Sequence, residues 1–282
     1  MSYECFDVDV RDGVAHLVMC RPEKRNSMNI AFWQELPEIV RDIDQNAKAR
    51  VIVISSTGPH FTAGIDLAAF GGNTLNPDDG DERTQAIRKG AAFYEHIQYL
   101  QAAFSALEQA RQPVLAAIQG GCIGGGVDMA SACDLRFATE DAYFLVEETN
   151  IGMTADVGTL PRLCYLMPEA IVKEMCLLAR PMPARRAQQF GLVSDVFADH
   201  ETMLEAVMAI AAEMAAKAPL AMRGCKQMIH YARDHSVEDA LDYIGIWNAS
   251  MMSTDEIMEA IGARAQKRAG QFVDLPKIKH QR

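Results

Sequence analysis

Hydrophobic and polar residues alternate along the first twenty residues of the chain. The runs "CFDVDV" and "VAHLVMC" lie on either side of Asp12 and Gly13, and alternating runs joined by an Asp-Gly pair predict a β-hairpin. Two later runs, "RVIVISS" at 50–56 and "PVLAAIQ" at 113–119, are apolar almost throughout. Such runs are typical of strands buried on both faces of a parallel sheet.

Longer segments follow a period of 3.6 residues instead. This period predicts helices near residues 29–46 and 88–111. Two further strand segments are expected in "LRFATEDAYFLVEE", and residues 194–197 are the last strand candidate. The rest of the chain is mostly helical in pattern. We therefore expect an α/β core over residues 1–199 and a helical region over residues 200–282.

Composition and charge exclude several classes of protein. The chain has 282 residues, 49% of them hydrophobic, which suits a globular protein with a sizeable core. Its formal net charge of −11 argues against nucleic-acid binding, because nucleic-acid binders normally present a basic face. No apolar run approaches the roughly 20 residues that span a bilayer. We expect neither a nucleic-acid partner nor a membrane.

The cysteines and the two ends of the sequence suggest a compartment. Seven cysteines occur at irregular spacing without a CxxC pair, so we expect reduced, mostly buried thiols. The start, "MSYECFDVDV", resembles neither a signal peptide nor an Arg-rich transit peptide. The end, "KIKHQR", is not a peroxisomal address. These features favour a cytoplasmic protein, and a bacterial one.

Two glycine-containing turns offer exposed backbone N–H groups. "FTAGIDL" (61–67) follows a strand; it suits either close approach to a substrate oxygen or an ordinary turn. "QGGCIGGGVDM" (119–129) opens a helix but matches neither a P-loop nor the dinucleotide fingerprint. Asp128 lies one turn inside that helix. It is either a partner of the helix dipole or a functional acid.

A third stretch, "VEETNIGMTADVG" (146–158), contains Glu147, Glu148 and Asp156 but no basic residue. A strand before it and a helix after it keep the loop short and close to the core. Carboxylates that line a cavity lose hydration and should have a task. No His stands at metal-ligand spacing, and no GxSxG motif suggests a serine hydrolase. We expect no metal.

Together these motifs resemble those of the crotonase (enoyl-CoA hydratase/isomerase) superfamily. "RPEKRNSMN", "FTAGIDL", "IQGGCIGGG", "CDLRFAT" and "GMTADVGTLPRL" occur in that family's order, and the resemblance covers roughly residues 5–270. It implies an α/β spiral of ββα turns with a helical C-terminal region for trimer packing. It also implies an acyl-CoA thioester as substrate, no further cofactor, and an oxyanion hole formed by the N–H groups of Ala63 and Gly125.

Three acids make the resemblance more specific. Asp128, Glu148 and Asp156 match the pattern of Δ3,5-Δ2,4-dienoyl-CoA isomerases, whereas hydratases have glycine at the third position. The resemblance implies that Glu148 removes a proton at C2, that Asp156 protonates C6, and that Asp128 lies nearer the thioester. We expect Glu147 to point away from the site. The alternatives are an enoyl-CoA hydratase and a catalytically silent CoA- or RNA-binding homologue.

Further residues are candidates for substrate binding. The CoA portion is expected along residues 23–26 and 64–70, and segment 70–105 is expected to line the acyl tunnel. Lys24 and Arg25 either contact the CoA phosphates or are merely solvated. The other candidates are backbone-rich positions in the two turns: Gly64, Ile65, Asp66, Leu67 and Gly124. "MLEAVMAIAAEMAAKA" has more apolar surface than a lone appendage should expose, so we expect a trimer or a pair of trimers.

Overall fold

The computed structural model describes residues 3–66 and 82–278. Its strands are β1 (Phe6–Arg11), β2 (Val14–Met19), β3 (Val51–Ser56), β4 (Val114–Ile118), β5 (Gly121–Ile123), β6 (Leu135–Thr139), β7 (Tyr143–Leu145), β8 (Met182–Pro183) and β9 (Asp195–Phe197). Within the described residues, one sheet has the order β1-β2-β3-β4-β6-β9, and a smaller one has the order β5-β7-β8. β1 and β2 are antiparallel, and the other neighbours in the larger sheet are parallel.

The predicted β-hairpin is confirmed. Arg11 pairs with Val14, and the two residues between them, Asp12 and Gly13, have φ angles of 50° and 78°. Two successive positive φ angles are typical of the tight turn whose twist matches that of a hairpin. The sequence pair Asp-Gly therefore places β1 at the edge of the sheet, beside β2.

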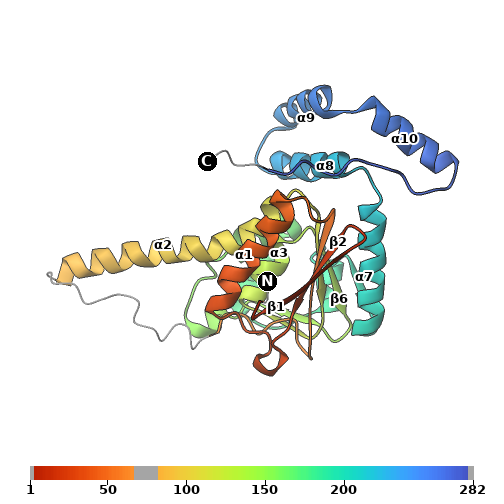
Figure 1. The fold of residues 1–282 in the computed structure, drawn as a ribbon. Coiled ribbons are helices and arrows are strands. Elements are labelled where there is room, and N and C mark those ends of the chain that lie inside the picture. Colours follow the sequence, from red (N-terminus) through yellow and green to blue (C-terminus); the bar gives the residue numbers. More distant parts are fainter. Residues whose placement is uncertain (1–2, 67–81, 279–282) are drawn as a thin grey trace.

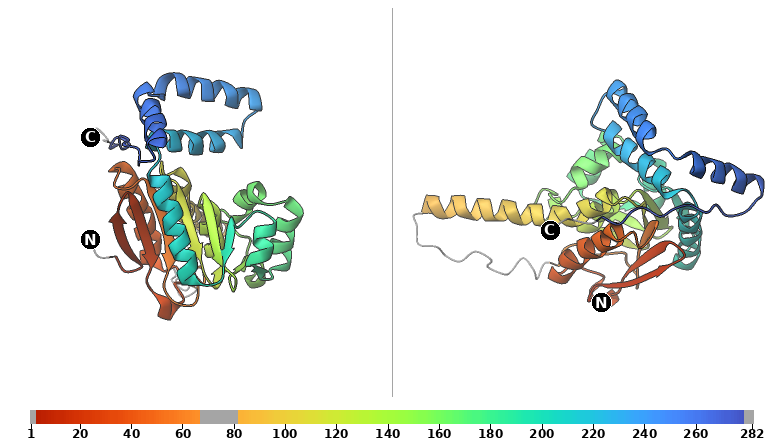
Figure 2. Two further views of the ribbon diagram at one scale, coloured as in Figure 1. Left: turned by 90° about the vertical axis from the view of Figure 1, so that its right-hand side faces the viewer. Right: turned by 45° about the horizontal axis from the view of Figure 1, so that its top comes forward.

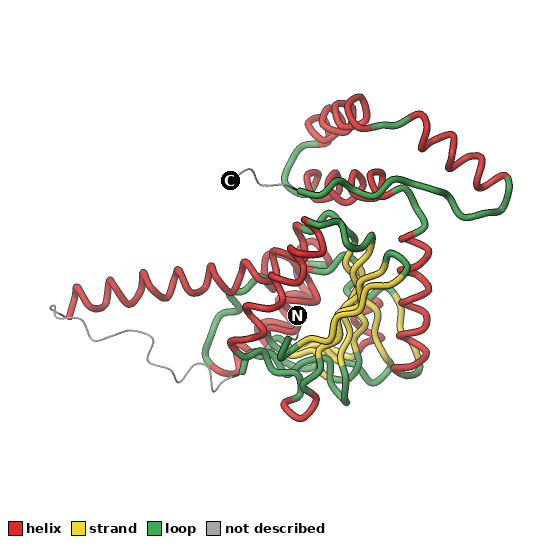
Figure 3. The backbone as a smooth tube through the Cα atoms, in the orientation of Figure 1, coloured by secondary structure: helices red, strands yellow, loops and turns green. Residues whose placement is uncertain are grey.

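Helices cover both faces of the larger sheet (Figures 1 and 3). Side chains along β3 alternate between the faces, as the twofold repeat of a strand requires. Val51 and Val53 pack against α7 (His200–Ala215), whereas Ile52 and Ile54 belong to the main core with α1 (Ile30–Gln45). Figure 2 shows α7 lying across the sheet. The continuous apolar run of β3 follows from this burial on both sides.

Two long helices carry the other wall of the core. Asn29 caps α1 by accepting a hydrogen bond from the N–H of Phe32, and the Trp33 ring lies 5.2 Å from that of Phe104 on α2 (Glu82–Gln109). α2 begins six residues before the expected start at 88. Its polar first half projects from the body of the molecule (Figure 1). The apolar repeat of 3.6 residues therefore begins later in the sequence, where α2 packs against the core.

The middle of the chain repeats a strand–strand–helix unit. β4 joins the larger sheet, β5 joins the smaller one, and α3 (Gly125–Ala132) follows. β6, β7 and α4 (Thr159–Leu166) repeat this order. The expected ββα turns are therefore present. The shorter helices are η1 (Pro22–Lys24), η3 (Glu148–Ile151), α5 (Glu169–Leu178) and α6 (Ala184–Gln189).

The last helices stand apart from the sheets (Figure 1). They are α8 (Pro219–Ala232), α9 (Val237–Met251) and α10 (Thr254–Ala265). The segment "MLEAVMAIAAEMAAKA" is mostly α7, and its apolar residues Met203, Val207 and Ala211 are buried against the sheet. Its apolar character is thus explained within the chain, and the exposed apolar residues lie later. No helix in the described ranges is long and apolar enough to cross a membrane.

Candidate active site

One cavity of about 350 Å³ brings the three sequence motifs together. The turn after β3, the glycine-rich turn before α3 and the acidic loop after β7 all contribute to its wall. The lining residues are Ser27, Ala63, Gly64, Ile65, Asp66, Ile123, Gly124, Gly125, Glu147, Glu148, Ile151, Met153, Asp156 and Val157. Backbone groups and carboxylates therefore face the same space.

The first turn presents a different N–H group from the one expected. The Ala63 N–H donates to the carbonyl oxygen of Arg25 at 2.9 Å, so the prediction that it serves the oxyanion hole is wrong. The Gly64 N–H is also bonded, to Thr62 Oγ1 at 3.1 Å. The N–H of Ile65 has no bond to any described residue, although Ile65 forms a backbone bridge with Met28. Ile65 therefore supplies the available donor.

The second donor lies beside it. Gly125 is the first residue of α3, where backbone N–H groups have no partner within the helix, and no described residue accepts its hydrogen. The two turns meet closely: a Cβ on Gly64 would lie 3.3 Å from the Gly125 nitrogen and 2.6 Å from the Ile123 oxygen. Gly64 also has a φ of 80°, so glycine is needed there. Ile65 and Gly125 form the candidate oxyanion hole.

Glu148 begins η3 at the wall of the cavity. Bonds from Thr149 Oγ1 to the Cys176 oxygen (2.7 Å) and from Asn150 Nδ2 to the Ala179 oxygen (3.0 Å) anchor this short helix to α5. Burial raises the pKa of Glu148; a backbone N–H opposes this, and the negative charges of Asp156 and Glu147 add to it. The Glu148 carboxyl is thus close to Asp156 and disposed to hold or take a proton.

Asp156 lies on the same wall, and its main chain is held by α2. Gln101 Nε2 donates to the Asp156 carbonyl oxygen at 2.6 Å. Burial raises the pKa of Asp156, and its own backbone N–H and His96 only partly offset this. Asp156 and Val157 also line a second cavity, of about 390 Å³, that reaches Gln101. Asp156 therefore lines both cavities.

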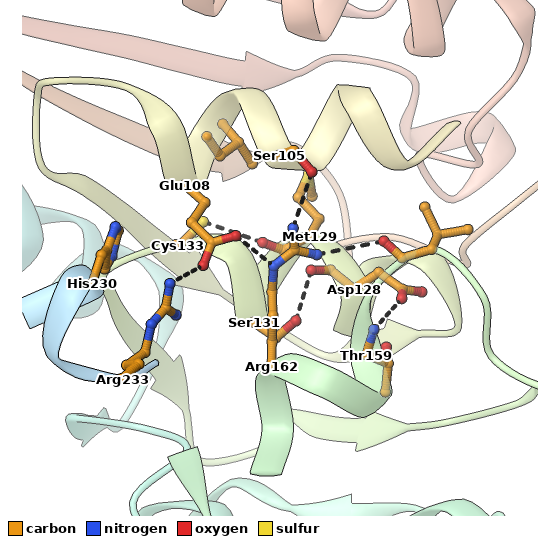
Figure 4. A network of polar contacts seen from close by, with 12 residues as sticks. Ser105, Glu108, Asp128, Met129, Ser131, Cys133, Thr159, Arg162, His230 and Arg233 are labelled. Carbon is orange, nitrogen blue, oxygen red and sulfur yellow. Dashed lines mark hydrogen bonds and ion pairs between the residues drawn. The ribbon is translucent and has the colours of Figure 1, made fainter. Parts of the chain in front are cut away.

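Asp128 is behind the cavity wall rather than in it. It has no exposed surface and is absent from the lining of the cavity that holds Glu148. Its Oδ1 accepts a hydrogen bond of 2.6 Å from the N–H of Thr159, the first residue of α4 (Figure 4). Burial, and next the charge of Glu148, raise the pKa of Asp128 to about 7. Glu148 is therefore the group of the cavity wall whose charge acts on Asp128.

An ion network that sequence reasoning missed supports the acidic loop (Figure 4). Arg162 pairs with Glu108 at 3.1 Å and donates to the carbonyl oxygen of Val157, the residue after Asp156. Arg233 pairs with the same Glu108 at 2.7 Å. Burial raises the pKa of Glu108, but the two arginines lower it more, so its pKa is below the ordinary value. Gly158, with φ 132°, leaves the space that the Arg162 guanidinium occupies.

The other expected site residues divide into groups. Four of them line the cavity: Gly64, Ile65, Asp66 and Gly124. Leu67 and the rest of the range 67–81 lie outside the described residues. Lys24 and Arg25 are exposed on η1 and do not line the cavity. Glu147 does line it, contrary to the expectation, because the strand ends at Leu145 and Glu147 caps η3.

The described residues contain no cluster of three or more His, Cys, Asp or Glu suited to a metal ion. Their cysteines are all free thiols. The polar groups that line the cavity include backbone donors and carboxyl groups. They can stabilise negative charge on an oxygen and move protons at two places.

The chain resembles known proteins of one family. Residues 9–275 match the family described as enoyl-CoA hydratase/isomerase. The chain is 41% identical over 279 residues to the mitochondrial Delta(3,5)-Delta(2,4)-dienoyl-CoA isomerase of Mus musculus, which covers 98% of this chain and 84% of that protein. It is 37% identical over 277 residues to the peroxisomal enzyme of the same name from Arabidopsis thaliana, covering 97% and 99%.

Solved structures share the fold. An enoyl-CoA hydratase from Bacillus anthracis matches with a TM-score of 0.84 and 26% identity, covering 98% of this chain and 100% of that one. The resemblance inferred from the motifs is confirmed: the chain belongs to the enoyl-CoA hydratase/isomerase family, the crotonase superfamily.

Proposed function

We propose that the protein is an isomerase that converts a 3,5-dienoyl-CoA into a 2,4-dienoyl-CoA. The observation that carries this proposal is the single cavity in which two free N–H groups and the carboxyls of Glu148 and Asp156 meet. The relatives of 41% and 37% identity that are named as dienoyl-CoA isomerases support the same assignment.

The reaction needs charge stabilisation and two proton transfers. Removal of a proton from C2 creates a dienolate whose negative charge lies on the thioester oxygen. The N–H groups of Ile65 and Gly125 are proposed to bind that oxygen, and each such donor typically contributes about 3 kcal/mol to the transition state. Because these donors belong to the backbone of packed turns, they need no rearrangement when the charge develops.

The two acids divide the proton transfers. Glu148 takes the proton from C2, and Asp156 delivers one to C6, because one carboxyl cannot easily serve both ends of the conjugated system. The first acid must start ionised and the second protonated. Burial raises the pKa of both, and the charge of Asp156 raises that of Glu148, so the pair favours holding one shared proton over two full charges.

A hydratase is the second candidate, because one of the solved structures with this fold is named an enoyl-CoA hydratase. A hydratase holds one water between two acids at adjacent carbons. Asp156 in the cavity wall adds a further carboxyl near the acyl chain, which favours the isomerase. Ultraviolet absorbance separates the two: isomerisation of a 3,5-dienoyl-CoA extends its conjugation to the thioester, whereas hydration of a 2-enoyl-CoA removes conjugation.

Two single variants test the division between the acids. Glu148→Gln should lose exchange of the C2 proton with D2O, and Asp156→Asn should keep some C2 exchange but lose net isomerisation. Each loss should be at least ~10²-fold, the lower range for general acid–base catalysis. Mass spectrometry reads the deuterium, and absorbance reads the conjugated product.

Glu147→Gln is the matched control, since Glu147 is another glutamate in the same wall. It should change both rates by less than about tenfold. If Asp156→Asn isomerised at nearly the wild-type rate, Asp156 would have no catalytic role, and hydratase would become the preferred assignment.

Three finer features belong to the same proposal. The CoA portion is proposed to enter past Ser27 and Asp66, which line the cavity. Lys24 and Arg25 precede Ser27 by only a few residues, and they are proposed to meet the CoA phosphates. The assembly is proposed to be a trimer or a pair of trimers formed through α8–α10. The protein is proposed to work in a reducing cytoplasm, which the free cysteines support.

A further inference from the structure

Three buried oxygen atoms in or behind the wall of the candidate active site have no hydrogen-bond partner among the described residues. They are Asp128 Oδ2, Thr159 Oγ1 and Glu148 Oε2, and none has a hydrogen bond within the part of the chain that the structure describes. Asp128 and Thr159 have no exposed surface at all. A carboxylate oxygen left in this state would cost several kcal/mol of lost hydration. A protonated carboxyl avoids most of that cost.

The bonds around Asp128 identify which oxygen would carry the proton. Oδ1 already accepts the N–H of Thr159 at 2.6 Å, and α4 begins at that residue (Figure 4). An oxygen that accepts a short N–H bond is the unprotonated one. The proton therefore belongs on Oδ2, which is the atom without a partner.

Among the described residues, the charge of Glu148 acts on Asp128 more strongly than the positive charge of Arg162 does. The titratable groups that influence it, or that it influences, are Glu148 from η3, Arg162 from α4, Cys122 from β5 and Cys176 from α5. Arg162 directs its N–H groups to Glu108, Ser105 and the Val157 oxygen instead. Of the two groups that affect Asp128 itself, Glu148 has the larger effect, and it is negative when ionised.

We propose that Asp128 acts as a neutral carboxylic acid whose Oδ2–H is directed toward the Glu148 carboxylate, which it holds in the ionised form that accepts a proton from the substrate. Asp128 is then a positioning residue rather than a catalytic one, since it lines neither cavity that contains Asp156. This role rests on the proposed function of Glu148. Burial acts in the same direction, because it raises the pKa of Asp128 to about 7.

Two substitutions distinguish a neutral donor from a charged acid. Asp128→Asn keeps an acceptor for the Thr159 N–H and a donor toward Glu148, but it cannot ionise. Asp128→Leu has the same branched shape with two methyl groups, and it has neither group. The Asn variant should keep kcat within about tenfold of the wild type, whereas the Leu variant should lose at least ~10²-fold. Circular dichroism and light scattering confirm that each variant is folded and assembled.

Infrared spectroscopy provides a readout that does not depend on turnover. The difference spectrum of wild type minus Asp128→Asn, at about pH 6, should contain the C=O stretch of a protonated carboxylic acid, because this pH lies below the pKa of about 7. Absence of that band overturns the proposal. So does a folded Asn variant that is as inactive as the Leu variant.

The two proposals can fail separately. If wild-type protein showed the protonated band but did not isomerise a 3,5-dienoyl-CoA, the proposed function would fail while the neutral state of Asp128 stood. If the protein isomerised the substrate but lacked the band, the function would stand and Asp128 would be an ionised acid.

Discussion

At the scale of single residues, the site depends on which backbone N–H groups are left without partners. Ala63, Gly64 and Ile65 follow one another in the same turn, yet only the N–H of Ile65 has no acceptor among the described residues. The motif "FTAGIDL" marked a turn that does line the cavity, but it could not identify which N–H group is left without a partner. The carbonyl oxygen of Arg25, which is 38 residues earlier in the chain, accepts the hydrogen bond of the Ala63 N–H. The sequence does not show this contact, because only folding brings the two residues together.

Gly125 allows a direct test of the oxyanion hole. Gly125→Pro removes the N–H at the first position of α3, where proline is otherwise tolerated, and turnover should fall by about 10²- to 10³-fold. Gly125→Ala is the control: it keeps the N–H, and its Cβ would meet the movable Met28 Sδ at 3.0 Å. Steady-state kcat measures both. Wild-type turnover in a folded Gly125→Pro protein would show that the donor lies elsewhere.

At the scale of elements, local sequence patterns predicted the helices and strands whose formation depends mainly on their own residues. The Asp-Gly turn between β1 and β2, the apolar runs of β3 and β4, and the amphipathic period of α1 all agree with the structure. The three-residue β5 and two-residue β8 were missed, because such short strands are defined by their neighbours in the smaller sheet.

The candidate site was predictable only in part for a similar reason. The acids were visible as carboxylates in an apolar run, and the resemblance to a family assigned roles to them. The supports of the acidic loop come from α2, more than 50 residues earlier in the chain: Gln101 reaches the Asp156 oxygen, and Glu108 holds Arg162. No periodicity or motif marks these residues, because their partners are brought together only by the fold.

The contact between α2 and the acidic loop predicts a positioning effect. Gln101→Leu removes the bond to the Asp156 oxygen and should let the carboxyl shift from its place. We expect kcat to fall by roughly 10- to 100-fold, as small displacements of a reacting group typically cause, with a smaller change in KM. Gln98→Leu is the matched control, because Gln98 donates to Tyr94 on the exposed side of α2 and to no other described residue. Equal effects of the two variants would contradict the positioning role.

At the scale of the whole molecule, the helices after α7 carry apolar surface that none of the described residues covers. Leu241 and Ile246 on α9, and Met258 and Ile261 on α10, are each about three-fifths exposed, at 63%, 64%, 61% and 59%. A monomer rarely leaves such a set in contact with water. The apolar surface that the sequence indicated is therefore real, but it lies on these helices rather than on α7.

Light scattering at micromolar concentration should accordingly give the mass of three or six chains. Ile246→Lys should reduce this mass, because it places a charge on the exposed face of α9. Ile87→Lys, at a similarly exposed position on α2 (63%), should leave it unchanged. A monomer mass for the wild-type protein would show that α8–α10 do not mediate assembly.

The proposed use of main-chain donors at Ile65 and Gly125 has a consequence for how such a site can change over time. Every amino acid except proline carries an N–H, so replacing the side chain at position 65 leaves the group that binds the oxygen in place. The part of the site that handles charge is thereby insulated from most point mutations. The carboxyl groups around it remain free to be exchanged, added or lost. A single scaffold can in this way acquire new proton-transfer chemistry without rebuilding the pocket that makes any of it possible.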